Sequence, residues 1–353
     1  MMVFSANAPR GRMLVIALTI VVAALALAPF VFAGSKPLNV AAKICVYILL
    51  VASYDLLIGF TGIVSFAHTM FFGIGAYGVA IALYELGPSW AAVGLGVVGA
   101  VATSAALAVV IGLLSLRVQT IFFAMATLAF ASAFAVLASQ LSGLTGGEDG
   151  RTFQVPALLR PGFKLVDAPV FGVEINGRVI AYYLVFATVA VLFLTLLRVV
   201  NAPFGRVLQA IRENPFRAEA LGYRLVVHRT LATVLGALFA TLAGALNALW
   251  LRYAGPDTTL SFSIMLDILV MVVIGGMGTL YGAVVGAAVF VLAQNYLQSL
   301  MGAAAAALAA AGAPLAAAFV NPDRWLFWLG LLFILSVYFF PSGVVGKLRA
   351  DPP

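Results

Sequence analysis

The sequence contains little charge and almost no cysteine. Only 9% of its 353 residues are charged, while 64% are hydrophobic and the mean hydropathy is +1.14. This composition excludes a soluble globular protein of this length. The single cysteine, Cys45, lies in an apolar run, which excludes a disulfide framework and a cysteine-based metal site. We therefore expect a polytopic membrane protein.

The sequence also lacks the motifs of the common enzyme classes. It has no Gly-x-x-x-x-Gly-Lys-Ser/Thr phosphate loop, so any ATP would be handled by another subunit. His68 and His228 have no histidine or cysteine at the spacing of metal ligands. The sequence also lacks the Gly-x-Ser-x-Gly turn that would indicate a hydrolase. The net charge of +7 comes mostly from the ends of apolar runs, which is typical of orientation signals rather than of nucleic-acid binding. We predict no catalytic residue, no metal and no cofactor.

Long apolar runs fill most of the chain. About 20 helical residues cross a bilayer core of about 30 Å. Ten runs qualify as complete or partial crossings: Met13–Ala33, Leu38–Ile58, Phe66–Leu83, Trp90–Ser115, Val118–Leu141, Ile180–Val200, Thr230–Leu251, Ile264–Ile274, Leu280–Met301 and Trp325–Phe340. We predict an all-α protein with about ten transmembrane or partly crossing helices in one domain, 1–353. The first run is long enough to be a retained helix rather than a cleaved signal peptide.

Two stretches interrupt this regular pattern. Glycines at 275, 276 and 278 break the run from Ile264 to Met301, so its first piece is either a full or a half crossing. The Ala-rich stretch 303–318 has high helix propensity but little to anchor it. We expect an exposed outer helix or a mobile loop there, not an eleventh crossing.

The distribution of basic residues predicts the orientation. With the N-terminus in the cytoplasm, eleven lysines and arginines lie inside. Outside, four remain once the long loop 142–179 is set aside: Lys36, Lys43, Arg252 and Arg324. We therefore expect both termini, and the polar segment 201–229, to be cytoplasmic.

The polar segment contains the signals of a short helix. Asn214 suits an N-cap, Pro215 a first helical position and Gly222 a left-handed stop, which together predict one to two turns over Pro215–Leu221. Its apolar residues, including Phe216, would fit a groove on a partner protein. The alternative is a basic loop held by anionic lipid.

Two glycine clusters lie elsewhere in the chain. The first would let a helix unwind and expose backbone to a cavity, so we take its members as a candidate substrate path: Gly59, Thr61, Gly62, Ser65, His68, Gly73 and Gly75. Close helix packing is the alternative. The second cluster, Gly278, Gly282 and Gly286, repeats every fourth residue and favours tight helix contact, within the chain or with a second membrane subunit.

Charges within the apolar runs are rare. Asp55 lies near the inner end of the second run and Asp267 within the eighth. Asp267 is either a ligand for a coupling ion or a carboxylate near the outer interface that reaches water or an arginine such as Arg252. In the outer loop, the turn-rich acidic patch containing Gly146, Gly147 and Asp149 is a candidate docking site for a soluble binding protein, or simply a loop.

Several motifs together resemble one family, the membrane subunits of ABC importers for branched-chain amino acids, specifically the larger of the two paired permeases. The resemblance extends over most of the chain. It is carried by Tyr54–His68, Phe72–Tyr77, Phe122–Phe130, Leu144–Gly150, Arg212–Gly222, Met271–Gly278 and Phe340–Gly343. Glu219-Ala220-Leu221-Gly222 resembles a shortened Glu-Ala-Ala…Gly permease signature, with Leu221 in place of the second alanine.

The resemblance implies that the polar segment is a coupling segment that docks onto an ATPase. Its candidate residues are Arg212, Glu213, Asn214, Pro215, Glu219, Ala220, Leu221 and Gly222. It also implies a bacterial inner membrane, a second homologous permease, two cytoplasmic ATPase subunits and an external binding protein. The expected cargo is a branched-chain or other small hydrophobic amino acid; urea, short amides and small aromatic acids are alternatives. An ion-coupled secondary carrier is the competing class.

Overall fold

The computed structural model describes residues 11–31, 34–114, 120–164, 174–310, 319–339 and 343–349. Most of these residues are helical. Their one sheet has two short antiparallel strands, β1 (Arg151–Thr152) and β2 (Tyr253–Ala254). The all-α prediction is confirmed. The Ala-rich residues 311–318 and the motif residues 340–342 lie outside the described part.

Ten long helices correspond to the ten predicted runs. They are α1 (Arg12–Val31), α2 (Ser35–Ile58), α3 (His68–Glu85), α4 (Trp90–Leu114), α5 (Thr120–Gln140), α7 (Gly177–Asn201), α10 (Leu225–Leu251), α12 (Phe262–Gly275), α13 (Leu280–Ala310) and α15 (Trp325–Phe339). Eight stretches of the described residues are long and apolar enough to cross a membrane. One of them joins α12 to the short helix α11 (Pro256–Thr259). The shorter α3 and α15 complete the set.

Two helices form the centre of the bundle. In its most apolar part α2 is 89% buried and α10 is 72% buried, against 22% for α1 and for most of α5. Small residues allow this close packing. A Cβ atom on Gly75 of α3 would overlap with the carbonyl oxygen of Thr241 in α10, and one on Gly244 of α10 with the carbonyl oxygen of Phe72. Helices α3 and α10 therefore touch backbone to backbone.

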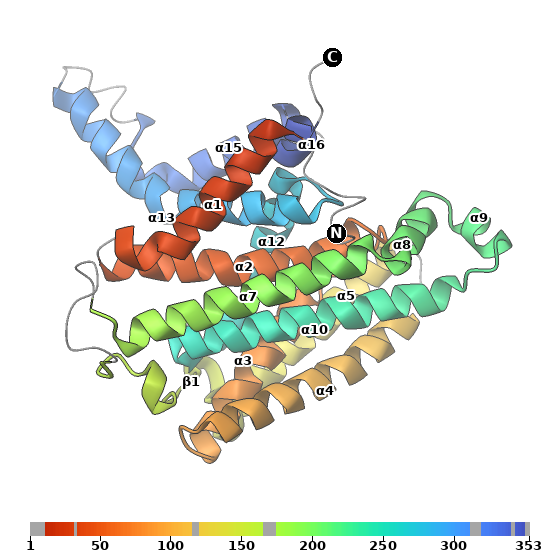
Figure 1. Ribbon diagram of the computed structural model, residues 1–353, viewed down its shortest axis with the longest axis horizontal. Coiled ribbons are helices and arrows are strands. Elements are labelled where there is room, and N and C mark those ends of the chain that lie inside the picture. The colour runs from red at the N-terminus through yellow and green to blue at the C-terminus, as the bar shows by residue number, and fades with distance from the viewer. Residues whose placement is uncertain are drawn as a thin grey trace.

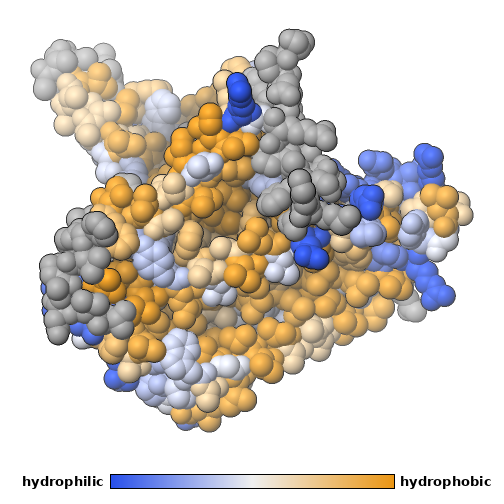
Figure 2. Space-filling model, viewed as in Figure 1, coloured by the Kyte–Doolittle hydropathy of each residue, from blue (hydrophilic) through white to orange (hydrophobic). Residues whose placement is uncertain are grey.

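The outer helices present apolar side chains to the surroundings. Figure 2 shows hydrophobic residues covering the length of the bundle, while hydrophilic residues gather where α8 and α9 lie in Figure 1. Side chains such as Val98, Ile121 and Leu326 are more than half exposed. This surface is suited to the lipid bilayer, and the chain is a multi-pass membrane protein.

Both described ends of the chain lie at the same end of the bundle. Leu14 of α1 packs with Val345 of α16 (Gly343–Arg349). Gly343 lies against Gly276, directly after α12. The sheet β1–β2 lies at the opposite end, where α10 finishes (Figure 1). The two described ends meet at one end of the bundle, as an even number of crossings predicts.

The described part of the Ala-rich stretch is helical. Residues 303–310 are the last turns of α13, which continues through Gly302, and residues 303–308 are exposed or half-buried. For these residues the structure agrees with the expected exposed helix and not with a loop. Alanine has the highest helix propensity, and no proline lies between Met301 and Ala310 to end the helix earlier. Figure 1 shows this end of α13 projecting away from the rest of the bundle.

Candidate functional site

The polar segment between α7 and α10 folds into two short helices, α8 (Pro203–Glu213) and α9 (Pro215–Ala220). The Asn214 side chain accepts a hydrogen bond from the Arg217 amide at 3.0 Å, which caps α9. At the other end Gly222 is left-handed, with φ +89°. The amides of Gly222 and Tyr223 donate back to the carbonyl oxygens of Glu219 and Ala218. The predicted helix, cap and stop are confirmed.

Sequence reasoning missed α8, because only the polar run from Arg206 onward was considered. The helix buries Gly205, Leu208 and Ile211 and exposes Arg206 and Arg212. Burial at three-residue intervals is the signature of an amphipathic helix. Pro203, at the first helical turn, was the available start signal.

The tip of the segment exposes apolar side chains outside the bundle. Phe216 is 82% exposed and Leu221 is 71% exposed, and the charged Glu219 lies between them in sequence. Figure 1 shows α9 at the outer edge of the molecule, beyond the ends of the long helices. A rigid helix with two free apolar side chains provides the anchors that a protein groove would accept.

Arg212 connects this segment to the bundle. Its guanidinium donates a hydrogen bond to the Gly59 carbonyl oxygen at the end of α2. Its Cγ would lie 3.1 Å from a Cβ on Gly62, which has φ +72°. The amide of Gly278, before α13, donates to Asp55 Oδ1 of α2 at 2.8 Å. We call Asp55, Gly59, Gly62, Arg212 and Gly278 the junction, because three separate turns meet there.

The remaining polar residues of the predicted substrate path are turned into the protein. The chain is non-helical between α2 and α3, as the glycines predicted. However, Thr61, Ser65 and His68 are at most 2% exposed. Thr61 Oγ1 donates to the Leu57 carbonyl oxygen at 2.6 Å, and His68 Nε2 lies 3.1 Å from Ser53 Oγ. Their role in a path stays a prediction.

The glycines of α3 lie in close packing. A Cβ on Gly73 would overlap with the Leu260 side chain, and Gly75 lies against α10 as described. The second cluster also packs within the chain, since Gly286 of α13 lies against the Met271 carbonyl of α12. The packing alternative therefore accounts for the positions of these residues.

The candidate docking patch is a set of tight turns at the sheet end of the bundle. Gly146, with φ +83°, follows α6 (Ser142–Thr145), and Gly147 begins the 3₁₀ turn η1 (Gly147–Asp149). Tyr253 Oη of β2 donates to the Asp149 carbonyl oxygen at 2.8 Å. Burial raises the pKa of Tyr253, and the nearby carboxylates of Asp257 and Asp149 add to this shift. The Asp149 side chain itself is exposed.

A polar cavity of about 580 Å³ was not anticipated. It lies between α2, α10, α12 and α13, toward the sheet end and away from the junction. Asp267 lines it and accepts a hydrogen bond from Gln294, not from Arg252. The sequence signals for this cavity were the charges of Lys43 and Asp267 within apolar runs. No local pattern indicated that the two side chains line the same cavity. A second cavity of about 320 Å³ includes Phe66 and Thr69.

Comparisons with known proteins identify the relatives of this chain. The family described as "Branched-chain amino acid transport system / permease component" matches residues 36–337. The high-affinity branched-chain amino acid transport system permease proteins LivM of Salmonella typhimurium and Escherichia coli are each 27% identical over 274 residues, covering 74% of this chain. The probable branched-chain amino acid transport permease protein LivM of Methanocaldococcus jannaschii is 28% identical over 174 residues, covering 49% of this chain and 48% of its own.

The match covers 63% of the Salmonella and Escherichia relatives, so this chain spans less than two thirds of their length. No solved structure gives a significant match.

Proposed function

We propose, starting from the fact that this chain belongs to the family of branched-chain amino acid transport system permease components, that it is the membrane-spanning subunit of an ATP-driven importer. As a permease component it is part of a transport system in the inner membrane, not an enzyme. The cargo would be a branched-chain or other small hydrophobic amino acid, delivered by an external binding protein. Two cytoplasmic ATPase subunits and a second, homologous permease would complete the complex.

The capped helix α9 carries this proposal. Its exposed Phe216 and Leu221 have no partner surface among the described residues of this chain. The sequence has no phosphate loop of its own. An ATPase that binds α9 differently in its ATP-bound and ATP-free states would shift the permease between conformations, whereas a contact of equal strength in both states would shift nothing.

The rigidity of the segment supports its use as a lever. An Asn cap contributes about 1 kcal/mol to a helix. The left-handed Gly222 closes the other end, and α8 is fixed to the bundle by Leu208 and Ile211. The segment 201–229 would therefore move with the ends of α7 and α10. This requires the coupling end of the bundle, and with it both termini, to lie in the cytoplasm.

The test uses two variants of the assembled complex in liposomes. Glu219→Lys keeps α9 folded but reverses a charge offered to the ATPase. Gly222→Val places a β-branched residue at a left-handed position and distorts the end of the lever. We expect both to insert normally and to lose substrate-stimulated ATP hydrolysis and uptake. Asp323→Lys, in the turn Pro322–Arg324 away from α8 and α9, is the charge-reversal control.

Two results would contradict the proposal. Hydrolysis and uptake at the unmodified rate in both variants would favour the alternative of a basic loop held by lipid. Uptake by this chain alone, driven only by an ion gradient, would instead identify a secondary carrier. Uptake of urea, short amides or small aromatic acids in preference to leucine would contradict the proposed cargo but not the proposed importer function.

A further inference from the structure

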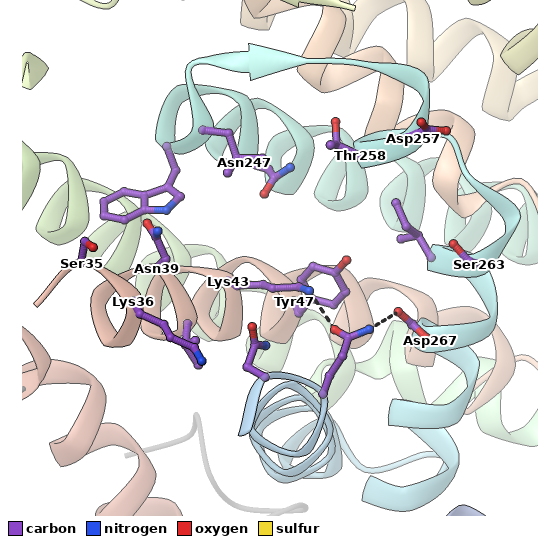
Figure 3. A pocket seen from close by; sticks show the side chains of 16 residues that line it. Ser35, Lys36, Asn39, Lys43, Tyr47, Asn247, Asp257, Thr258, Ser263 and Asp267 are labelled. Carbon is purple, nitrogen blue, oxygen red and sulfur yellow. Dashed lines mark hydrogen bonds between the residues drawn. The ribbon is translucent and has the colours of Figure 1, made fainter. Parts of the chain in front are cut away.

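The polar cavity lies within the membrane-spanning helices. Ser35 to Tyr47 of α2 and the end of α10 contribute to its wall, with the start of α12 and Gln294 of α13 opposite. Figure 3 shows these side chains pointing into a common space. Its volume of about 580 Å³ falls in the range of small-molecule sites, about 300–1,000 Å³. The cavity is therefore large enough for a single amino acid.

Four charged residues line this space, Lys36, Lys43, Asp257 and Asp267, and Lys43 and Asp267 are joined through a third residue instead of forming an ion pair. Lys43 Nζ donates to Gln294 Oε1 at 2.8 Å, and Gln294 Nε2 donates to Asp267 Oδ2 at 3.3 Å (Figure 3). A neutral amide thus separates the ammonium group from the carboxylate. Charged residues in membrane helices are costly and usually functional, so a permanent structural role would be better served by direct pairing.

The side-chain amide of Gln294 presents an acceptor to Lys43 and a donor to Asp267, as a zwitterionic amino acid would. Its oxygen accepts from the lysine and its nitrogen donates to the aspartate. The carboxylate and ammonium groups of a free α-amino acid present the same acceptor and donor, and both carry full charges. An amino acid that took over these contacts would replace two hydrogen bonds between a charge and a neutral amide with two hydrogen bonds between opposite full charges.

A third polar group supports a ligand at this place. Asn247 of α10 is only 7% exposed, and no hydrogen bond of its side chain is found within the described residues. Figure 3 shows its amide on the cavity side of α10. Buried amides nearly always have a partner. A ligand in the cavity would supply one.

We propose that this cavity binds the zwitterionic head of an α-amino acid, with Asp267 receiving the ammonium group and Lys43 the carboxylate. The apolar parts of the wall, Tyr47, Trp250 and Ile264, would hold an aliphatic side chain. The cavity lies at the end of the bundle opposite the coupling segment, so it would receive cargo from outside. That the ligand is the transported amino acid rests on the proposed function. That the cavity recognises two opposite charges on its ligand rests on the positions of Lys43 and Asp267.

The experiment measures protection of a reporter thiol at the cavity. The natural Cys45 is 1% exposed and should react slowly, while Ser263 lines the cavity and is exposed. In the assembled complex, without binding protein, L-leucine should slow maleimide labelling of Ser263→Cys. Two probes that each lack one charge, 4-methylpentanoate and 3-methylbutylamine, should protect only at concentrations at least about tenfold higher, since a charged hydrogen bond contributes about 1.5–3 kcal/mol.

Matched variants test the two assigned residues in the same background. Asp267→Asn and Lys43→Met should each weaken protection by leucine at least about tenfold, by the same relation. Lys43→Arg, which keeps the charge, should retain protection. Asp323→Asn is the control, because this carboxylate lies in the turn η3 (Pro322–Arg324) and does not line the cavity.

The proposal would be overturned by equal protection from leucine and both single-charge probes, or by no protection at all. This probe comparison needs only the reporter variant Ser263→Cys, so it decides even if Asp267→Asn fails to assemble. Leucine uptake with unchanged KM in Asp267→Asn and Lys43→Met would also overturn it, and would leave the importer function standing. Loss of ATP-driven uptake in the unmodified complex would instead contradict the proposed function.

Discussion

Arg212 of α8 donates a hydrogen bond to the main-chain carbonyl oxygen of Gly59, a residue 153 positions earlier in the sequence. The contact ties the polar segment 201–229 to the end of α2, the most buried of the candidate spans. Asp55 of the same helix end accepts from the Gly278 amide, which adds the start of α13. A displacement of α9 would therefore reach the centre of the bundle through the junction, and from there the helices that line the polar cavity.

Removing this contact should uncouple ATP hydrolysis from transport. In Arg212→Ala the Gly59 carbonyl loses a charged donor, and an unmet buried group costs about 1–3 kcal/mol. We expect basal hydrolysis to persist while amino acid taken up per ATP falls about tenfold, the equivalent of about 1.4 kcal/mol. The measurement is uptake and phosphate release in the same liposomes.

Arg206→Ala is the matched control for this variant, because Arg206 is exposed on the same helix and makes no contact at the junction. Arg212→Lys should restore part of the coupling, since it keeps one donor but not the planar guanidinium. Equal uptake per ATP in Arg212→Ala and Arg206→Ala would show that the junction transmits nothing.

The backbone contacts at the centre should make two glycines irreplaceable. A Cβ at Gly75 or Gly244 would overlap with a carbonyl oxygen of the facing helix, so the helices must separate. Overpacking costs about 1–3 kcal/mol or more. We expect Gly75→Ala and Gly244→Ala to lower the thermal unfolding temperature of the purified chain. Gly94→Ala is the control, because no atom lies within 4 Å of its added Cβ; an equal loss in that variant would remove the packing explanation.

Local rules predicted the parts of this structure that depend on neighbouring residues. Runs of about 20 apolar residues predicted the long helices. The side chain of Asn214 and the missing Cβ of Gly222 predicted the two ends of α9. These features follow from contacts that a residue makes within one or two turns of its own helix.

Long-range packing produced the features that the sequence did not reveal. Arg212 and Gly59 were assigned to different roles, coupling and path, and only the folded chain brings them together. Lys43, Asp267 and Gln294 come from three helices, and no spacing rule connects them. Helix packing decides such neighbours through shape, which a single sequence does not record.

The predicted substrate path can be separated from a packing role at Ser65. Its side chain is 1% exposed and accepts a hydrogen bond from the Ala67 amide at 3.3 Å. If the stretch between α2 and α3 moves to line the path, Ser65→Leu should reduce uptake while the complex still assembles and hydrolyses ATP. If the residue serves packing alone, the same variant should lose assembly and uptake together. Ser65→Ala adds no volume and provides the control; uptake and complex yield are measured side by side.

The acidic turn at the sheet end should contribute to capture of the binding protein. Asp149 and the neighbouring Glu148 are exposed, and the turn that presents them is fixed by Gly146 and by the hydrogen bond from Tyr253. Fixed charges at the rim of an interface mainly change the association rate. With Asp149→Lys we therefore expect that about tenfold more binding protein is needed for half-maximal stimulation of ATP hydrolysis at low salt, within the usual range for electrostatic steering.

The salt dependence decides whether this effect is electrostatic. Over a Debye length of about 8 Å at physiological ionic strength, exposed charges are largely screened, so the difference between Asp149→Lys and the unmodified complex should shrink as salt is added. Asp323→Lys reverses a charge on a different turn and should leave the required concentration unchanged. A defect in Asp149→Lys that is the same at low and high salt would point to damage of the turn itself. No defect at either salt concentration would show that the binding protein docks elsewhere and that the patch is an ordinary loop.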